Sequence, residues 1–351
     1  MTTFPVLGPV RHHRRPLQRS RSALDAGCLT VGFLGGSITA PKTGTRWPEP
    51  FTGWLVQRFP GARFVFENAA LGATGSDLAV FRAEPEIIAR VCDLVFVEYA
   101  VNDIGTSMTL RNCTRDGLLR QLMASGADVV LVYTFYAEML ADMEAGRVPP
   151  SVAELEALAG HYSLGSIWAG LHAWTEVCRG LMTWRDWLPD GLHPEQRGSL
   201  SYAQAIIAFC AEELGGDLTD RHRQERLTMP AALQADCWDK FSRCDLTTLE
   251  LTGPWSLHRW FTCLGMARAL TTNVPGATLR CAFEGRGFVL GFDFGRLSGE
   301  VRYRVDGGEW RQTERDRPDW CGDSGWYRPT LVAVPGGRGT VTTIGLVGVI
   351  H

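Results

Sequence analysis

The 351-residue sequence predicts an α/β domain built on a parallel sheet, followed by a smaller antiparallel β domain. Two observations predict this division. Up to about residue 214, short apolar strand-like runs alternate with segments of helical periodicity, which is typical of a parallel sheet covered by helices on both faces. Beyond residue 230, helical periodicity fades and short runs of alternating polarity indicate antiparallel strands. A hydrophobic content of 45% provides for a sizeable core.

Four apolar runs bounded by turn residues are the expected strands of the first domain. They lie at 31–34, 63–68, 94–99 and 128–133. Helices are expected at 47–58, 77–90, 114–125, 151–158, 166–179 and 199–214. The first of these helices has an early proline, which the opening turn of a helix tolerates. Together these segments form an alternating β/α series.

The second domain is expected to be a small β-sandwich. Its expected strands lie at 278–283, 287–292, 301–305, 331–334 and 341–347. Asp306-Gly307-Gly308 is a hairpin signal between the segments 303–305 and 309–311. A charged connector at 221–226 precedes this region. We therefore predict a basic N-terminal segment over 1–27, a first domain over 28–220 and an accessory sandwich over 221–351.

Composition and charge exclude several classes of function. A net charge of -3 argues against nucleic acid as the main partner. No apolar window is long enough to span a membrane, and residues 1–27 lack the apolar stretch of a signal peptide. The basic side chains of residues 1–27 are expected to be solvated, in a segment that wraps the domain. The ten cysteines include no C-x-x-C pair, which argues against a zinc ribbon and favours a reducing compartment. We expect a cytoplasmic protein without a membrane partner, metal or cofactor.

A serine follows the first expected strand, at the edge where open α/β sheets bind their ligands. The apolar run 28–34 ends in Gly35-Gly36-Ser37. Asn102 follows the third strand, and the loop 69–76 follows the second. Because the carboxyl ends of parallel strands share one edge of the sheet, these three segments should converge.

The chain also supplies what a nucleophilic serine needs. Asp190 and His193 lie three residues apart in one loop between prolines. A histidine can take the proton of the serine, and a carboxylate can orient the histidine. The Asn102 amide and main-chain N–H groups at Ser37 and in the 69–76 loop could stabilise an oxyanion. Each residue alone has an ordinary explanation as a turn or cap residue, but their combination favours acyl-transfer chemistry.

These motifs resemble those of the SGNH hydrolases of the GDSL-like superfamily over about residues 29–214. The four matching blocks are Gly35-Gly36-Ser37-Ile38-Thr39, Asn68-Ala69-Ala70-Leu71-Gly72-Ala73-Thr74, Tyr99-Ala100-Val101-Asn102-Asp103 and Asp190-Gly191-Leu192-His193. Gly36 stands where the family has aspartate, and Ala100 stands where it usually has glycine. The resemblance assigns the oxyanion main-chain donor of the second block to either Gly72 or Ala73.

The resemblance implies a three-layer, flavodoxin-like α/β/α fold with a jelly-roll-like accessory domain. It also implies a metal-independent serine esterase with Ser37, His193 and Asp190 as its triad. The expected substrate is an acyl ester, above all an acetyl ester, on a saccharide, a glycoconjugate or another small molecule. One alternative is an O-acyltransferase with the same triad, and another is a glycan-binding protein with a vestigial α/β domain.

Three tryptophans are candidates for the face of a sugar ring, since aromatic rings suit apolar sugar faces. They are Trp47, Trp184 and Trp187, of which Trp187 is favoured because it lies nearest in sequence to His193. Core packing is the competing explanation for each of them. The sequence leaves the oligomeric state open.

Overall fold

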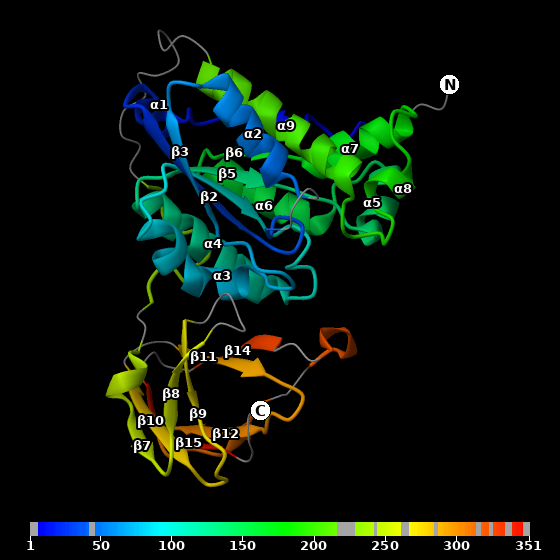
Figure 1. The fold of residues 1–351 in the computed structure, drawn as a ribbon. Coiled ribbons are helices and arrows are strands. Elements are labelled where there is room, and N and C mark those ends of the chain that lie inside the picture. The colour runs from blue at the N-terminus through cyan, green and yellow to red at the C-terminus, as the bar shows by residue number, and fades with distance from the viewer. Residues whose placement is uncertain are drawn as a thin grey trace. The chain divides into compact units, whose positions relative to one another are not determined.

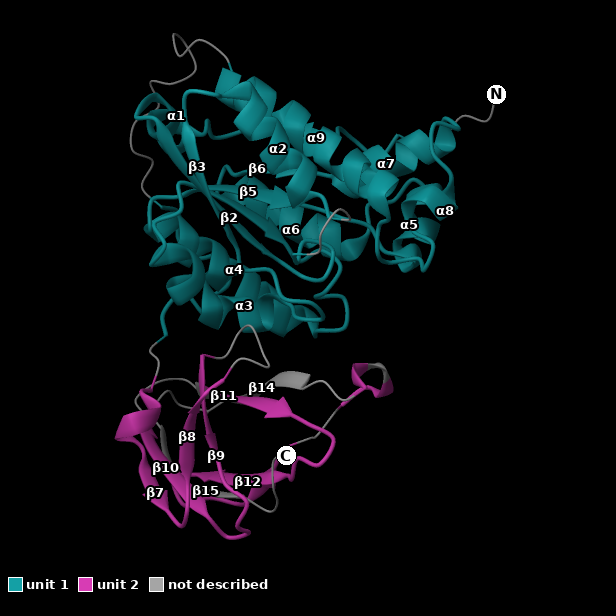
Figure 2. Ribbon diagram, viewed as in Figure 1, with its two compact units in different colours: residues 1–241 teal, residues 242–351 magenta. Residues whose placement is uncertain are grey.

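The computed structural model describes residues 6–41, 46–215, 229–241, 244–260, 267–283, 287–313, 317–322, 326–333 and 339–346. Figure 1 traces the elements along the chain. The chain divides into two compact units, residues 1–241 and 242–351 (Figure 2). The predicted connector 221–226 lies outside the described residues.

The first unit contains a six-stranded sheet. Its strands are β1 (Arg11–His12), β2 (Cys28–Gly35), β3 (Arg63–Asn68), β4 (Leu94–Glu98), β5 (Asp128–Val132) and β6 (Gly165–Ile167). The order across the sheet is β1-β6-β5-β4-β2-β3. Strands β2 to β6 are parallel, and β1 pairs antiparallel with β6. Numbered among themselves, the parallel strands have the order 2-1-3-4-5, which is that of flavodoxin-like folds. The predicted α/β class is thus confirmed.

Helices cover the sheet on both sides. The α-helices of this unit are α1 (Gln18–Asp25), α2 (Pro48–Arg58), α3 (Ser76–Ala83), α4 (Met108–Ala124), α5 (Leu140–Glu144), α6 (Pro150–His161), α7 (Ala169–Cys178), α8 (Trp184–Trp187) and α9 (Gln196–Gly215). A π-helical turn, η1 (Glu84–Ile88), extends α3, and a 3₁₀ turn, η2 (Ala137–Met139), precedes α5. Helices α2, α7 and α9 lie on one face of the sheet, and α3, α4 and α6 on the other (Figure 1).

The core lies between the sheet and its two helical layers. Strand β4 is buried along its whole length, as expected for a continuous apolar run in the middle of a parallel sheet. Four aromatic rings from β2, β4, α2 and the residue preceding α2 stack edge-on or face-on against one another; they are Phe33, Trp47, Phe51 and Phe96. This cluster supports the carboxyl end of β2, from which Ser37 projects.

The sequence-based prediction missed the short strand β6. The segment 166–179 was expected to be one helix, but Gly165–Ile167 pairs with β5 and only Ala169–Cys178 is helical. A three-residue strand is too short to establish an alternating pattern, so the helical periodicity that follows it dominates the window. The even shorter β1 was not predicted for the same reason.

The described part of the basic N-terminal segment is integrated into the first unit. Strand β1 extends the sheet, and α1 packs against β2. Arg19 pairs with Asp93 at 2.9 Å, and Nδ1 of His13 contacts Glu213 at 2.7 Å. These basic side chains therefore balance acidic groups of the same unit.

Residues 229–241 also pack on the first unit, so the boundary lies beyond the predicted residue 220. The backbone N–H of Trp238 donates to the carbonyl of Cys113 in α4 at 3.2 Å. Arg120 pairs with Asp239 at 3.0 Å. The ring of Trp238 lies against Phe81 of α3. This segment covers the α3–α4 surface before the chain enters the second unit.

The second unit consists of small antiparallel sheets, as predicted. Its strands are β7 (Glu250–Thr252), β8 (Ser256–Arg259), β9 (Arg268–Thr271), β10 (Thr278–Phe283), β11 (Gly287–Phe294), β12 (Val301–Val305), β13 (Arg311–Gln312), β14 (Trp326–Ala333) and β15 (Gly339–Leu346), with 3₁₀ turns η3 (Leu246–Thr248) and η4 (Asp319–Cys321). The largest sheet has the order β13-β12-β15-β10-β7, and β8-β9 and β11-β14 form separate pairs. Asp306 and Gly307 have φ values of 51° and 73°, which suit the tight turn of the predicted β12–β13 hairpin.

Within the described part of the chain, no helix is long and apolar enough to cross a membrane. The same residues contain no group of three or more histidine, cysteine, aspartate or glutamate side chains that could hold a metal ion.

Candidate active site

The site lies where the strand order of the sheet reverses. Strands β2 and β4 are neighbours at this point, and Gly35 is in register with Glu98. Ser37 follows β2 by two residues, and Asn102 follows β4 by four. Open α/β sheets bind their ligands at such a point, because the loops after the two strands turn to opposite faces and leave a crevice between them.

Three of the predicted side chains form one hydrogen-bonded chain. The hydroxyl Oγ of Ser37 lies 2.8 Å from Nε2 of His193. On the other side of the ring, Nδ1 of His193 lies 2.8 Å from Oδ2 of Asp190. The structure therefore brings together Ser37 and a loop that lies more than 150 residues further along the chain.

Asp190 determines which histidine nitrogen carries the proton. Burial opposes ionisation of Asp190, but N–H groups of His193 and Leu192 donate to its carboxylate and hold its pKa below the ordinary value. The backbone N–H groups of His193 and Leu192 both donate to Oδ1, at 2.6 and 2.9 Å. An ionised carboxylate can only accept, so Nδ1 of neutral His193 is the donor and Nε2 is left to accept the Ser37 proton.

Asn102 and Gly72 both lie beside the serine turn. A Cβ atom added to Gly36 would lie 1.9 Å from Oδ1 of Asn102, so the amide covers the backbone immediately before Ser37. A Cβ atom added to Gly72 would lie 3.5 Å from Cβ of Ser37. Ala73 is exposed, with a left-handed φ of 57°. Of the two alternatives in the second block, Gly72 is thus the residue next to the serine.

A buried carboxyl group that the sequence analysis did not select supports the serine turn from behind. Glu98 has no exposed surface, and Oε2 accepts a hydrogen bond from Oγ1 of Thr39 at 3.0 Å. Its Oε1 accepts from Oγ1 of Thr134 at 2.7 Å. Burial raises the pKa of Glu98 to about 7, although hydrogen bonds from Thr134, Thr39 and the Gly36 N–H oppose the rise. The feature of the sequence that could have indicated Glu98 is its place as a single acidic residue at the end of an otherwise apolar strand.

We expect Glu98 to make the stability of the protein depend on pH. The unfolded chain releases this proton near pH 4.5, whereas the folded protein holds it to about pH 7. The Glu98 contribution is thus complete below pH 4.5 and is lost as the pH rises through 7. The two pKa values correspond to about 3 kcal/mol of unfolding free energy. Urea denaturation of the protein and of Glu98→Gln at pH 5 and 8 should show a smaller fall with pH in the variant.

Asp128 serves as the companion variant for this measurement. Burial raises its pKa to about 6, so it contributes to the same fall in stability with pH. Asp128→Asn should remove a separate part of the slope and leave the Glu98 part in place. An unaltered slope in Glu98→Gln would contradict the assignment.

Burial corrects two of the predicted substrate contacts. Trp47 and Trp187 are each 0% exposed, because they fill the core beneath the site. Nε1 of Trp47 donates to Oγ1 of Thr39 at 2.9 Å, and the ring of Trp187 lies 4.7 Å from that of Phe135. Neither ring can present a face to a substrate. Trp184 is 39% exposed and stacks on Trp187, so it keeps a ring surface open.

The chain is similar to known proteins in sequence and in fold. Residues 33–199 match the model of the GDSL-like Lipase/Acylhydrolase family. The crystal structure of CEX, a two-domain esterase active on acetylated mannans, has a TM-score of 0.79 at 21% identity and covers 97% of this chain and 93% of that chain. A second structure of that esterase, co-crystallised with mannopentaose, has a TM-score of 0.70 at 21% identity and covers 97% of both chains.

The search of curated proteins found no match. The similarity to the solved structures extends over both units and shows their fold. The family model matches within the first unit. Residues 33–199 are therefore a GDSL-like lipase/acylhydrolase domain, and this family is an esterase family.

Proposed function

We propose that the protein is a serine esterase that hydrolyses acetyl esters on a saccharide. The observation that carries this proposal is the continuous hydrogen-bonded chain from Ser37 through His193 to Asp190. A serine hydroxyl is a weak nucleophile on its own, and an adjacent oriented base activates it. The position of Asn102 and Gly72 beside the serine supports an oxyanion hole at the same place.

The proposed reaction has two halves. Ser37 Oγ attacks the ester carbonyl carbon while Nε2 of His193 takes its proton, and Asp190 stabilises the resulting imidazolium. The carbonyl oxygen becomes an oxyanion, which the Asn102 amide and the N–H groups of Ser37 and Gly72 bind. The tetrahedral intermediate collapses as the bond to the sugar oxygen breaks and His193 protonates that oxygen, which releases the sugar alcohol and leaves an acetyl group on Ser37. Water, deprotonated by His193, then attacks this ester. His193 returns the proton to Oγ as the bond to the acyl carbon breaks, which releases acetate and restores Ser37.

Two features support a saccharide substrate. The two-domain esterase that this chain resembles over nearly its whole length is described as active on acetylated mannans. In this chain, Trp184 offers a partly exposed ring on a rigid base of Trp187, with the Asp190–His193 loop directly after it. A large aromatic face held by buried rings suits the apolar face of a pyranose. We therefore propose an acetylated mannan as the first substrate to test.

Acetate release from acetylated mannan tests the proposal. The protein should release acetate, and the Ser37→Ala variant should not. The same reaction with added mannopentaose distinguishes the acyltransferase alternative, since a transferase would place acetyl groups on the added acceptor in preference to water. Absence of both products with the mannan and with p-nitrophenyl acetate would contradict an acyl-transfer function of either kind.

A further inference from the structure

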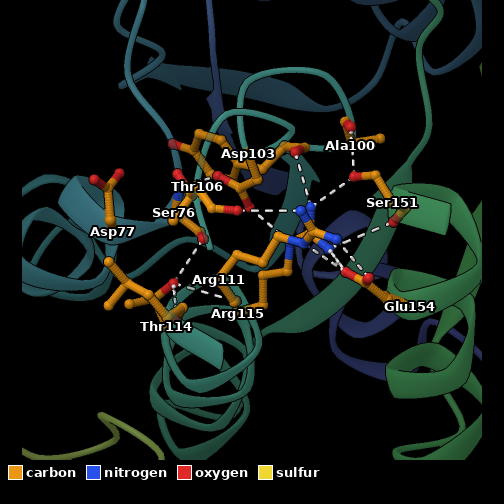
Figure 3. Close-up of polar contacts among 12 residues, drawn as sticks. Ser76, Asp77, Ala100, Asp103, Thr106, Arg111, Thr114, Arg115, Ser151 and Glu154 are labelled. Atoms are coloured by element: carbon orange, nitrogen blue, oxygen red, sulfur yellow. Dashed lines mark hydrogen bonds and ion pairs between the residues drawn. The ribbon is translucent and has the colours of Figure 1, made fainter. Parts of the chain in front are cut away.

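A second buried carboxylate, outside the hydrogen-bonded chain, lies between two loops of the candidate site. Asp103 follows Asn102 directly and is 0% exposed. Its Oδ1 accepts a hydrogen bond from the backbone N–H of Ser76 at 2.7 Å, and its Oδ2 accepts one from Nε of Arg115 at 2.6 Å (Figure 3). Ser76 is the first residue of α3 and ends the loop that carries Gly72. One carboxylate thus contacts the loop after β3 while it belongs to the loop after β4.

Arg115 holds the same turn from the opposite side. Its guanidinium is 1% exposed and donates to the carbonyl of Tyr99 at 3.4 Å and to Oγ of Ser151 at 2.7 Å. The Ser151 hydroxyl in turn donates to the carbonyl of Ala100 at 2.6 Å (Figure 3). Arg115 therefore fixes the carbonyl of Tyr99 directly and that of Ala100 through Ser151. Its ion pair fixes Asp103, which follows Asn102.

We propose that Asp103 and Arg115 are a positioning pair for the oxyanion hole, which fixes Asn102 relative to Gly72. The inference rests on the proposed esterase function, because the pair touches no reacting atom and acts through those two residues. The two loops come from different strands, and their contacts with Asp103 set their separation. A displacement of about 1 Å at an oxyanion donor is enough to reduce the rate about 100-fold.

The arrangement depends on the negative charge of Asp103 and on the close approach of the α3 terminus to its carboxylate. The buried guanidinium of Arg115 has two anionic partners, Asp103 at 2.6 Å and Glu154 at 3.1 Å, and of these two Asp103 is the fully buried one. Loss of one partner from a buried ion pair is strongly unfavourable. The anionic Asp103 also lies at the N-terminus of α3, where a negative charge is favourable. A Cβ atom on Gly75 would lie 2.3 Å from Oδ1 of Asp103, so only glycine lets the α3 terminus reach the carboxylate.

The Asp103→Asn variant of the full chain tests the proposal. It keeps the shape of the side chain but sets an amide against Arg115, so the two loops lose their shared anchor. We expect kcat for p-nitrophenyl acetate to fall about 10- to 100-fold with KM changed less than about twofold. Inhibition by phenylboronic acid should weaken by a similar factor, because its tetrahedral Ser37 adduct places an oxygen in the oxyanion hole.

Asp116→Asn is the matched control. Asp116 is also a fully buried aspartate and is adjacent to Arg115 in α4, but it accepts hydrogen bonds from the backbone N–H of Gln234 at 2.7 Å and from the hydroxyl of Tyr162. We expect this variant to lose stability and keep its kcat. A merely structural role for Asp103 predicts that both variants lose stability while both keep kcat and boronic acid affinity, and that result would overturn the proposal.

A second variant keeps the test valid if Asp103→Asn fails to fold. Gly75→Ala forces the α3 terminus away from Asp103 and leaves both charges of the ion pair in place. It should lower kcat more than it raises KM, and an unchanged kcat would overturn the proposal. Failure of the esterase function itself would look different, since wild-type protein and Ser37→Ala would then show the same background rate.

Discussion

Replacement of Ser37 by alanine is expected to reduce kcat by about 10⁴-fold or more, with the fold intact. The variant keeps the oxyanion donors but removes the hydroxyl that His193 is placed to deprotonate, at 2.8 Å. Without that oxygen no acetyl-enzyme can form, and water would have to attack the ester directly. The residual rate should be the small part that the oxyanion donors and substrate binding supply by themselves.

Two measurements and two further variants test this prediction. Turnover of p-nitrophenyl acetate gives the fall in kcat, and circular dichroism with thermal unfolding shows that the variant is folded. Ser22→Ala is the control, since Ser22 is an exposed serine on α1 and should be silent. The double variant with His193→Ala should be no slower than Ser37→Ala alone, because residues that act as a unit are not additive. A rate within tenfold of wild type would exclude Ser37 as the nucleophile.

Removal of the Asn102 amide is expected to have the second largest effect. A single oxyanion-hole donor contributes about 10² to 10³ in kcat. Asn102→Ala should therefore lower kcat by about this factor and leave KM nearly unchanged, because the donor acts on charge that develops only in the transition state. Steady-state kinetics on p-nitrophenyl acetate separates the two constants. A rise in KM with unchanged kcat would instead make Asn102 a substrate-binding residue.

Gly36→Ala tests the same donor without deleting it. The new methyl group would lie 1.9 Å from Oδ1 and 2.5 Å from Cγ of Asn102, so the amide has to move away. We expect kcat to fall in the same direction as in Asn102→Ala. Gly53→Ala in α2 is the matched control, because no atom lies within 4 Å of the added group and alanine is favoured over glycine inside a helix. Equal kinetics in the two glycine variants would contradict the role of this close approach.

The parts of the site that sequence could predict are those fixed by strand ends. Ser37 and Asn102 follow apolar runs, and the common edge of a parallel sheet brings such positions together whatever the side chains between them are. Asp103 and Arg115 could not be paired in this way, because their contact depends on how α4 packs beside the turn. Glu98 and Thr134 could not be paired from the sequence either, because their contact depends on β4 and β5 lying side by side in the sheet. The burial of Trp47 and Trp187 likewise results from how the helices and strands pack, which is hard to predict from the sequence of one chain.

The compactness of the Asp190–His193 loop bears on how such a site tolerates sequence change. Asp190 accepts hydrogen bonds from both the backbone and the ring of His193, so the geometry between acid and base is internal to one short turn. The rest of the fold then has to maintain only the position of the whole turn relative to Ser37. A chain that has to preserve one alignment instead of two can diverge widely elsewhere, and this agrees with a shared architecture at only 21% identity.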